Sequence, residues 1–159
     1  GEEGVLVHNE CKTAKQVDTG DGSTIKIDSY ENMRADPDVT SQAHHISQDA
    51  SFRDVIPREK GLSVELDGNA FKDIGSGHYN AHKTMESFWD TFRKGGSRFG
   101  ERPTIGEYNR ALYDSMIDAN KGKNAAVTIV KKAYEQQREY GLLNNDFVPR
   151  IPGRIYQAK

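Results

Sequence analysis

The segment from His78 to Lys94 constrains the fold of this chain more than any other part of it. Its apolar residues recur at positions i, i+4, i+7 and i+11, which places them on one stripe of an α-helix: Ala81, Met85, Phe88 and Phe92. Ser76 is a suitable N-cap in front of the segment, and Gly95-Gly96 ends it. An amphipathic helix is stable in water mainly through packing of its apolar face, so the chain is expected to fold around this stripe.

Further elements are predicted on both sides of this helix. Toward the C-terminus, Thr104-x-x-Glu107 matches a capping box that opens a second helix, and a third runs from about residue 124 to 141. Toward the N-terminus, alternating apolar and polar residues predict strands over 24–28 and 62–67. Short strands followed by helices indicate an α+β fold. The tail from Pro149 is expected to extend over the surface.

Length and composition fit one folded domain with a short leader. The 159 residues include fourteen aromatic side chains, which argues against disorder. No stretch approaches the roughly 18 apolar residues of a membrane span, and the single cysteine, Cys11, permits no internal disulfide. Residues 1–37 are acidic and rich in turn formers, so we predict a loosely structured leader there and the domain over 38–159.

The formal net charge of −2 hides an uneven distribution. Residues 1–50 contain ten acidic side chains against four Lys and Arg, whereas residues 51–159 contain fourteen against eighteen. A basic body suits a polyanionic partner, but an excess of this size is also typical of a solvated surface. Charge alone therefore does not assign a partner.

Four of the five histidines form two pairs that differ in geometry. His44 and His45 are adjacent, so they point to opposite sides of an extended backbone. His78 and His82 are spaced i, i+4 on the predicted helix, which puts both imidazoles on one face roughly 5–6 Å apart. That is the spacing by which two helical histidines share a cation. The two pairs, one on each side of a predicted strand, together predict a metal site.

Such a site suits phosphodiester hydrolysis. A bound cation acts as a Lewis acid, and a histidine with a pKa near neutrality can activate water as a general base. Three imidazole ligands favour Zn²⁺ or Ni²⁺ over Mg²⁺, although availability can select Mg²⁺. Two other interpretations stay open. A structural zinc site would use Cys11 or His8 as its fourth ligand, and a metal-free interaction domain would leave the histidines dispersed.

Two strings of the sequence resemble the AHH-type nucleases of the HNH/endonuclease VII superfamily: Gln42-Ala43-His44-His45-Ile46-Ser47-Gln48 and Gly77-His78-Tyr79-Asn80-Ala81-His82. The pattern also looks like that of the colicin DNase domains. The resemblance spans residues 42–94, about a third of the chain. It implies a ββα-metal (His-Me finger) core, a β-hairpin and a helix around one divalent cation, here with additional C-terminal helices.

By position, the resemblance implies that His44, His78 and His82 bind the metal and that His45 is the general base. The products would carry a 5′-phosphate and a 3′-hydroxyl. Many superfamily members have Asp where His44 stands and Asn where one helical histidine stands, and the 32 residues between His45 and His78 are a longer insert than in compact members. Asn69 or Asn80 can therefore take a ligand or orienting role.

The resemblance also implies a nucleic-acid substrate, with DNA expected and an RNase on the same scaffold as the alternative. The side chains expected to bind phosphate are Arg53, Arg58, Lys83, Arg93 and Arg98. Those expected to orient the imidazoles are Gln48, Asp49, Asn69 and Asn80.

Members of this family are commonly found as C-terminal toxin domains of bacterial polymorphic toxins. The resemblance therefore implies a cognate immunity protein as a partner. The string Gly4-Val5-Leu6-Val7-His8-Asn9 resembles the end of a Hint (intein-like) self-cleaving module. In such a module His8 would assist cyclisation of Asn9. Residues 1–37 would then hold the end of this pretoxin module. The domain would be exported as part of a larger protein and act in the cytoplasm of a target cell.

Overall fold

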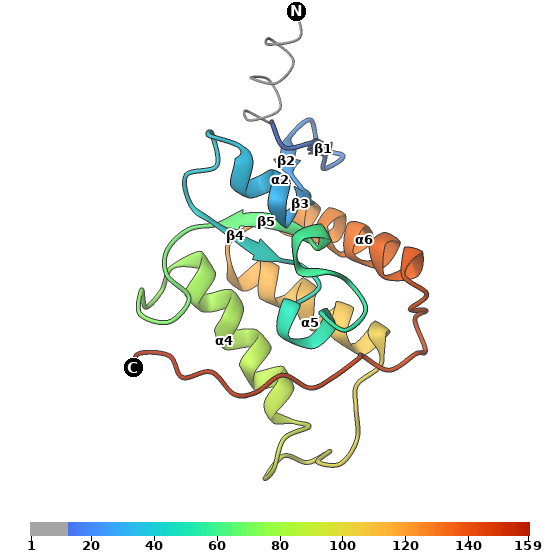
Figure 1. The fold of residues 1–159 in the computed structure, drawn as a ribbon. Coiled ribbons are helices and arrows are strands. Elements are labelled where there is room, and N and C mark those ends of the chain that lie inside the picture. The colour runs from blue at the N-terminus through green and yellow to red at the C-terminus, as the bar shows by residue number, and fades with distance from the viewer. Residues whose placement is uncertain (1–12) are drawn as a thin grey trace, which may run out of the picture.

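The computed structural model describes residues 13–159, and in this range short strands precede long helices (Figure 1). The strands are β1 (Gln16–Asp18), β2 (Thr24–Lys26), β3 (Asp28–Ser29), β4 (Gln42–His45) and β5 (Leu62–Leu66). The helices are α2 (Tyr30–Ala35), α3 (Asp49–Phe52), the 3₁₀-helix η1 (Arg58–Lys60), α4 (Gly77–Asp90), α5 (Ile105–Asp118) and α6 (Lys123–Glu139). The predicted α+β class is confirmed.

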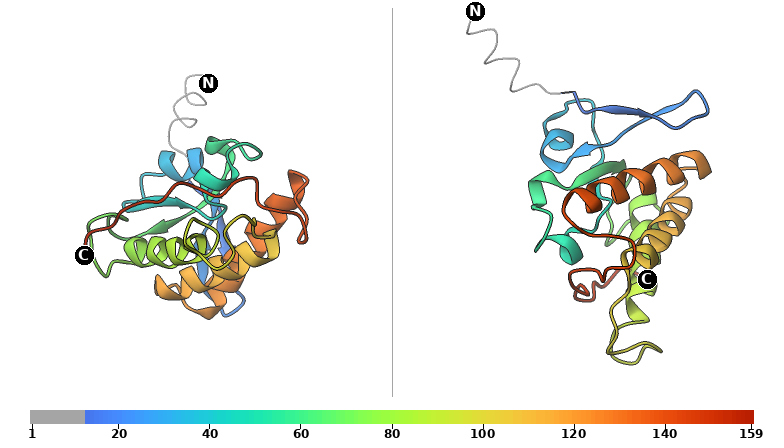
Figure 2. Two further views of the ribbon diagram at one scale, coloured as in Figure 1. Left: turned by 90° about the horizontal axis from the view of Figure 1, so that it is seen from below. Right: turned by 90° about the vertical axis from the view of Figure 1, so that its right-hand side faces the viewer.

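A three-stranded antiparallel sheet of order β3-β5-β4 positions the first histidine pair. In the register of β4 and β5, His44 lies opposite Val64 and His45 lies opposite Ser63. Residues opposite each other in an antiparallel pair share a face, so His44 shares the face of Val64, a core residue, and His45 takes the other face. Strands β1 and β2 form a separate hairpin that projects from the body (Figure 2).

The three long helices supply most of the core. Helix α4 packs on α5, and α5 packs on α6. The stripe predicted for α4 is confirmed, because Ala81, Met85 and Phe92 are buried and Phe88 is partly buried against the same core. Other fully buried side chains from these helices and the sheet include Val64, Leu66, Trp89, Leu112, Met116 and Ile129.

The predicted helix starts are confirmed, and one predicted helix end is not. The Ser76 hydroxyl accepts a hydrogen bond from the Tyr79 N–H, and Thr104 and Glu107 form the reciprocal capping box. Helix α4 ends at Asp90 and not at Lys94, because the chain turns back through residues 91–99. A Cβ at Gly96 would lie 2.1 Å from the Asp90 carbonyl oxygen, so this close return requires glycine.

The segment predicted to be a loosely structured leader contains regular elements. Residues 16–35 form β1, β2, β3 and α2, and β3 is an edge strand of the sheet that carries His44. Lys26 forms an ion pair with the buried Asp36, which also accepts from the Ala14 N–H. The strand predicted over 24–28 is confirmed in part by β2, whereas the other short elements carry little periodicity of their own and depend on tertiary contacts. The Hint-like string, with His8, and Cys11 lie outside the described residues.

The tail from residue 149 to 159, here called the C-terminal strap, runs in extended form along α4, as predicted (Figures 1 and 2). The Ile155 N–H donates to Glu86 of α4 at 3.0 Å, and the Ala158 N–H donates to the Phe71 carbonyl at 2.7 Å. The strap therefore connects α4 with the loop between β5 and α4. Within residues 13–159, no helix has the length and apolarity required to cross a bilayer.

Candidate metal centre

Three of the four paired histidines converge between β4 and α4. One ring nitrogen from each of His44, His78 and His82 lies within 4.8 Å of the other two. The ring centroids are 4.9–5.1 Å apart. From a triangle of this size, shifts of about 1 Å or less bring each nitrogen to the 2.0–2.1 Å typical of a zinc–imidazole bond. These three residues, the histidine cluster, lie close enough together to hold one metal ion.

Hydrogen bonding leaves the cluster with nitrogens available to a cation. Nδ1 of His78 lies 3.2 Å from the Gly68 carbonyl oxygen, which only accepts, so Nδ1 carries the hydrogen and Nε2 keeps its lone pair. Nδ1 of His82 is buried and has no hydrogen-bond partner within residues 13–159. A buried nitrogen without a partner is costly, and a metal ion would satisfy it. The donor set therefore fits a divalent cation.

Burial keeps the three imidazoles neutral, the form that binds metal. Burial lowers the pKa of His44 well below its usual value, and the neighbouring His82 and His78 add to this effect. Burial also lowers the pKa of His82 to about 4, again with a contribution from His78. The pKa of His78 is lowered by burial, although its bond to the Gly68 carbonyl opposes the shift. No proton has to be displaced near neutral pH before metal binds.

Helix α5 fixes the chain immediately after the first histidine pair. The buried Tyr108 hydroxyl donates to the Ile46 carbonyl at 2.6 Å and accepts from the Gln48 N–H at 2.8 Å. Burial raises the pKa of this hydroxyl, so it stays protonated and can donate. Tyr108 thereby holds the end of β4 in place relative to the helices.

His45 lies outside the histidine cluster, as expected for a neighbouring residue on an extended strand. Its ring stacks on Tyr30 with centroids 4.4 Å apart and planes 20° apart. Its Nε2 lies 2.8 Å from the Arg58 carbonyl oxygen. Burial lowers the pKa of His45, and the bond to this carbonyl opposes the shift. The Tyr30 ring therefore restrains the face of the imidazole, and the Arg58 carbonyl restrains its edge.

The bond to Arg58 determines the tautomer of His45. A carbonyl oxygen only accepts, so Nε2 carries the hydrogen and Nδ1 of the neutral ring keeps its lone pair. Gly61 is required for this position, because a Cβ there would lie 2.7 Å from Cδ2 of His45. The arrangement presents an imidazole with one basic nitrogen, oriented by its backbone and aromatic contacts.

The basic residues predicted to bind phosphate have different environments. Lys83 forms no ion pair within the described part of the chain, so its ammonium group is available. Arg53 pairs with Asp49 at 2.8 Å and is half exposed, while Arg58 lies over the Tyr30 ring at 4.9 Å from its centroid. Arg98 is bound by Glu101 and Glu107.

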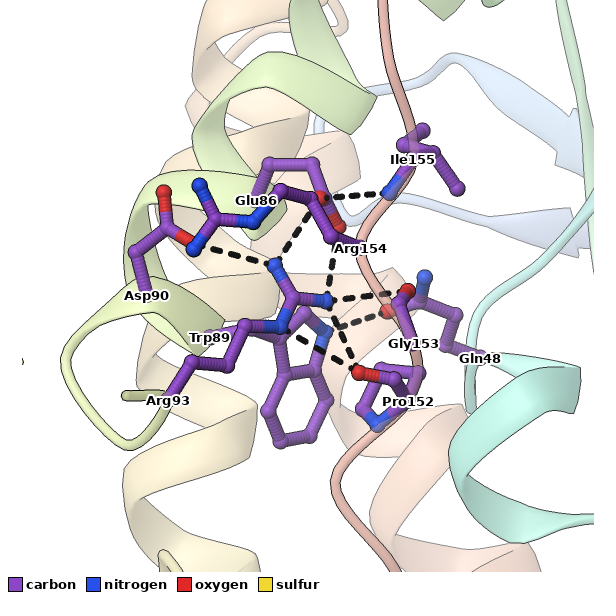
Figure 3. A network of polar contacts seen from close by, with 9 residues as sticks. All are labelled: Gln48, Glu86, Trp89, Asp90, Arg93, Pro152, Gly153, Arg154 and Ile155. Carbon is purple, nitrogen blue, oxygen red and sulfur yellow. Dashed lines mark hydrogen bonds and ion pairs between the residues drawn. The ribbon is translucent and has the colours of Figure 1, made fainter. Parts of the chain in front are cut away.

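Arg93 is buried in a network with the C-terminal strap (Figure 3). Its side chain is 9% exposed, and its guanidinium group pairs with Glu86 and Asp90 and donates to the carbonyl oxygens of Pro152 and Gly153. Since its donors are engaged within the protein, Arg93 fastens the strap to α4 and does not present a free charge. Arg93 is therefore not available to bind phosphate.

Replacing Arg93 with alanine is expected to lower the free energy of unfolding by about 3 kcal/mol, because Glu86 would lose its buried partner. Urea unfolding measures this change. Arg53→Ala is the matched control, since its exposed pair with Asp49 should contribute only about 0.5 kcal/mol. Equal effects of the two substitutions would contradict the assigned role.

Among the described residues, none of those predicted to orient the imidazoles forms a hydrogen bond to a histidine ring. The two hydrogen bonds of the histidine rings go to the carbonyl groups of Arg58 and Gly68. Gln48 accepts from the Trp89 indole N–H at 2.8 Å (Figure 3). Asn69 accepts from the Phe71 and Lys72 N–H groups. Asn80 donates to the carbonyl oxygens of Gly75 and Asp118. One buried oxygen of Asp49 has no hydrogen-bond partner among the described residues, and the other binds Arg53.

The sequence did not reveal the groups that hold the imidazoles. Tyr30 lies in the acidic segment before the domain boundary that we predicted, and no motif marks it. The carbonyl groups of Arg58 and Gly68 are part of the backbone and carry no sequence signal. Gly61 lies next to a predicted strand, where glycine often marks the close approach of another group. This glycine was the one sequence signal for the position of the His45 ring.

Comparisons of the chain with protein-family models, curated proteins and solved structures find no match.

Proposed function

We propose that this chain is a metal-dependent endonuclease of the His-Me finger type, with His44, His78 and His82 as metal ligands and His45 as the general base. The observation that carries the proposal is the convergence of three imidazoles, together with a fourth, His45, that follows His44 on β4 and is oriented by its own contacts. The antiparallel pair of β4 and β5 followed by α4 agrees with the ββα-metal core that the resemblance implies.

The bound metal would supply a Lewis acid that polarises the scissile phosphate. The chain's own contribution is the proton transfer. Nδ1 of His45 accepts a proton from water while Nε2–H stays bound to the Arg58 carbonyl, and the stacked Tyr30 ring limits movement of the imidazole. Lys83, which is exposed and follows His82 on α4, is the cation that we propose to bind a neighbouring phosphate.

Three protein ligands suit a catalytic metal site. A structural zinc site is closed by four protein ligands, whereas a catalytic site keeps one position open. Within residues 13–159, the group of potential ligands contains three histidines and no cysteine or carboxylate. Imidazole ligands favour Zn²⁺ or Ni²⁺, and Mg²⁺ is the alternative. A metal-free interaction domain would not explain why the three imidazoles converge.

The biological setting rests on the resemblance alone. We propose a toxin domain that is delivered as part of a larger exported protein, acts in the cytoplasm of a target cell and is inhibited by an immunity protein. DNA is the expected substrate, and RNA is the alternative on the same scaffold.

Cleavage assays test the proposal. Plasmid DNA and a folded RNA of similar length are each incubated with the protein loaded with Zn²⁺, Ni²⁺ or Mg²⁺, and parallel reactions contain a chelator. We expect metal-dependent nicking of DNA with 5′-phosphate ends. Cleavage of RNA alone would assign an RNase, and no cleavage of either with any metal would contradict the proposed function.

Gly61→Ala is expected to reduce cleavage by about 100-fold, because its Cβ would overlap the His45 ring and displace the base. The backbone at Gly61 has φ of −60°, which alanine adopts readily, so the fold should persist. Cleavage kinetics and zinc titration measure the two effects separately. Gly153→Ala is the control, since nothing lies within 4 Å of a Cβ at that position. Unchanged cleavage by Gly61→Ala would contradict the proposed position of the base.

A further inference from the structure

Two exposed aromatic side chains lie near the histidine cluster. Phe71 is 51% exposed and Tyr156 is 82% exposed. The Phe71 ring centroid lies 6.4 Å from that of His82, with the ring planes 34° apart. The strap brings the region of Tyr156 to the same loop, because the Ala158 N–H donates to the Phe71 carbonyl. The Phe71 ring therefore lies beside the candidate metal centre, and Tyr156 lies two residues before the strap residue that binds the Phe71 backbone.

An open groove of about 610 Å³ is lined by α4, by the loop before it and by the C-terminal strap. Tyr156 and Ile74 line it, together with Asn80 and Lys83 of α4. The groove runs along the same helix that carries His78 and His82, on a face that neither histidine lines. Its lining residues on α4 extend from Tyr79 to Asp90, roughly 16 Å at the rise of an α-helix, which is long enough for an extended chain molecule.

The free charges of the groove are positive. Lys83, Arg154 and Lys159 line it, and its acids are Glu86 and Asp90. Both acids are already in ion pairs with Arg93, and Asp90 also pairs with Arg154. Lys83 and Lys159 form no ion pair within residues 13–159. Two unpaired ammonium groups in an open groove favour a polyanionic occupant.

Hydrogen bonds hold the strap on each side of Tyr156, through a backbone N–H at Ile155 and through the side-chain amide at Gln157. The Ile155 N–H binds Glu86 at 3.0 Å, and the Gln157 amide donates to the carbonyl oxygens of Ala70 and Tyr79 at 2.6 and 2.9 Å. The exposed ring is thus presented from a held segment, which reduces the entropy lost when a ligand packs on it.

We propose that this face, formed by Phe71, Tyr156 and the groove, binds single-stranded nucleic acid. Unpaired bases stack on the two rings, and the phosphates lie near Lys83 and Lys159. Stacking on a side chain requires a free base face, which a duplex hides between its base pairs, whereas aromatic side chains in a basic groove are the common means of holding a single strand. The inference rests on the proposed function, for which it names the substrate class.

The test is binding of fluorescein-labelled oligothymidylate, oligouridylate and a DNA duplex of equal length to the zinc-loaded full chain. Stopped-flow anisotropy reads binding within milliseconds, so the result does not depend on later cleavage. We expect both single strands to bind at least tenfold more tightly than the duplex, and a preference between the two would identify DNA or RNA. Phe71→Ala and Tyr156→Ala should each weaken single-strand binding by about tenfold. Phe99→Ala is the matched control, because Phe99 is 64% exposed and lies outside this face.

Other outcomes separate the two proposals. Single-strand binding that depends on both aromatic residues without any cleavage would support this inference and contradict the nuclease. Cleavage of duplex DNA with affinity unchanged in both variants would support the nuclease and overturn the single-strand assignment. If none of the three probes binds, the single-strand proposal is overturned, and the face serves another occupant such as a protein.

Discussion

Replacing His82 with alanine is expected to lower the affinity of the chain for Zn²⁺ by more than about 100-fold and to abolish metal-dependent cleavage. Loss of a residue that only supports a ligand costs 10- to 100-fold in metal affinity, and loss of a ligand itself costs more. The change removes one of the three converging imidazoles, whose buried Nδ1 has no hydrogen-bond partner among the described residues. Zinc titration by calorimetry measures the affinity.

Asn80→Ala on the same helix is the control for this experiment. Its amide binds the Gly75 and Asp118 carbonyl oxygens, so we expect zinc affinity to be unchanged. If Asn80→Ala lost zinc and His82→Ala kept it, the ligand assignment would be wrong. Chelation provides a second check, because a structural site would unfold on metal removal. The helices pack through a separate apolar core, so we expect the helical circular dichroism to persist after chelation.

Replacing His45 with glutamine is expected to reduce cleavage by about 10²- to 10⁴-fold while zinc binding is kept, because a positioned general base contributes a factor of this size. Glutamine retains an N–H donor for the Arg58 carbonyl but has no nitrogen that can take up a proton. Single-turnover cleavage of DNA measures the rate, and calorimetry confirms the metal content. His45→Ala should give the same loss.

Tyr30→Phe is the matched control for His45. It keeps the ring that stacks on the imidazole and removes only the hydroxyl, which is bound to the Arg58 side chain. We expect cleavage within a few-fold of the unchanged protein. Full activity in His45→Gln would eliminate His45 as the base, whereas loss of zinc in the same variant would show that His45 contributes to metal binding.

Local patterns were sufficient to predict the long helices and the pairing of the histidines. The stripe from Ala81 to Phe92, the Ser76 cap and the Thr104–Glu107 capping box all act within a few residues, so they can be recognised without knowledge of the fold. The i, i+4 spacing of His78 and His82 likewise follows from helix geometry. The opposite directions of His44 and His45 follow from the alternation of an extended strand.

Contacts between distant residues determine the remaining features. Arg93 was predicted to face nucleic acid because its charge is evident in the sequence, but the strap that surrounds it begins more than fifty residues later. Residues 1–37 were predicted to be a loosely structured leader apart from a strand over 24–28, because β3 and α2 are too short to show a period. Strand β3 is ordered by pairing with β5, and α2 by packing on β4 and β5. A local pattern contains no information about which distant segment will arrive beside it.

The sequence by itself determined the α+β class, the apolar face of α4 and the residue types available for metal chemistry. Only the tertiary structure decided that His44 meets His78 and His82, because nothing local sets the distance between a strand and a helix separated by a long loop. It also decided the tautomer of His45, since the Arg58 carbonyl that fixes the proton on Nε2 is a backbone group that every residue type provides.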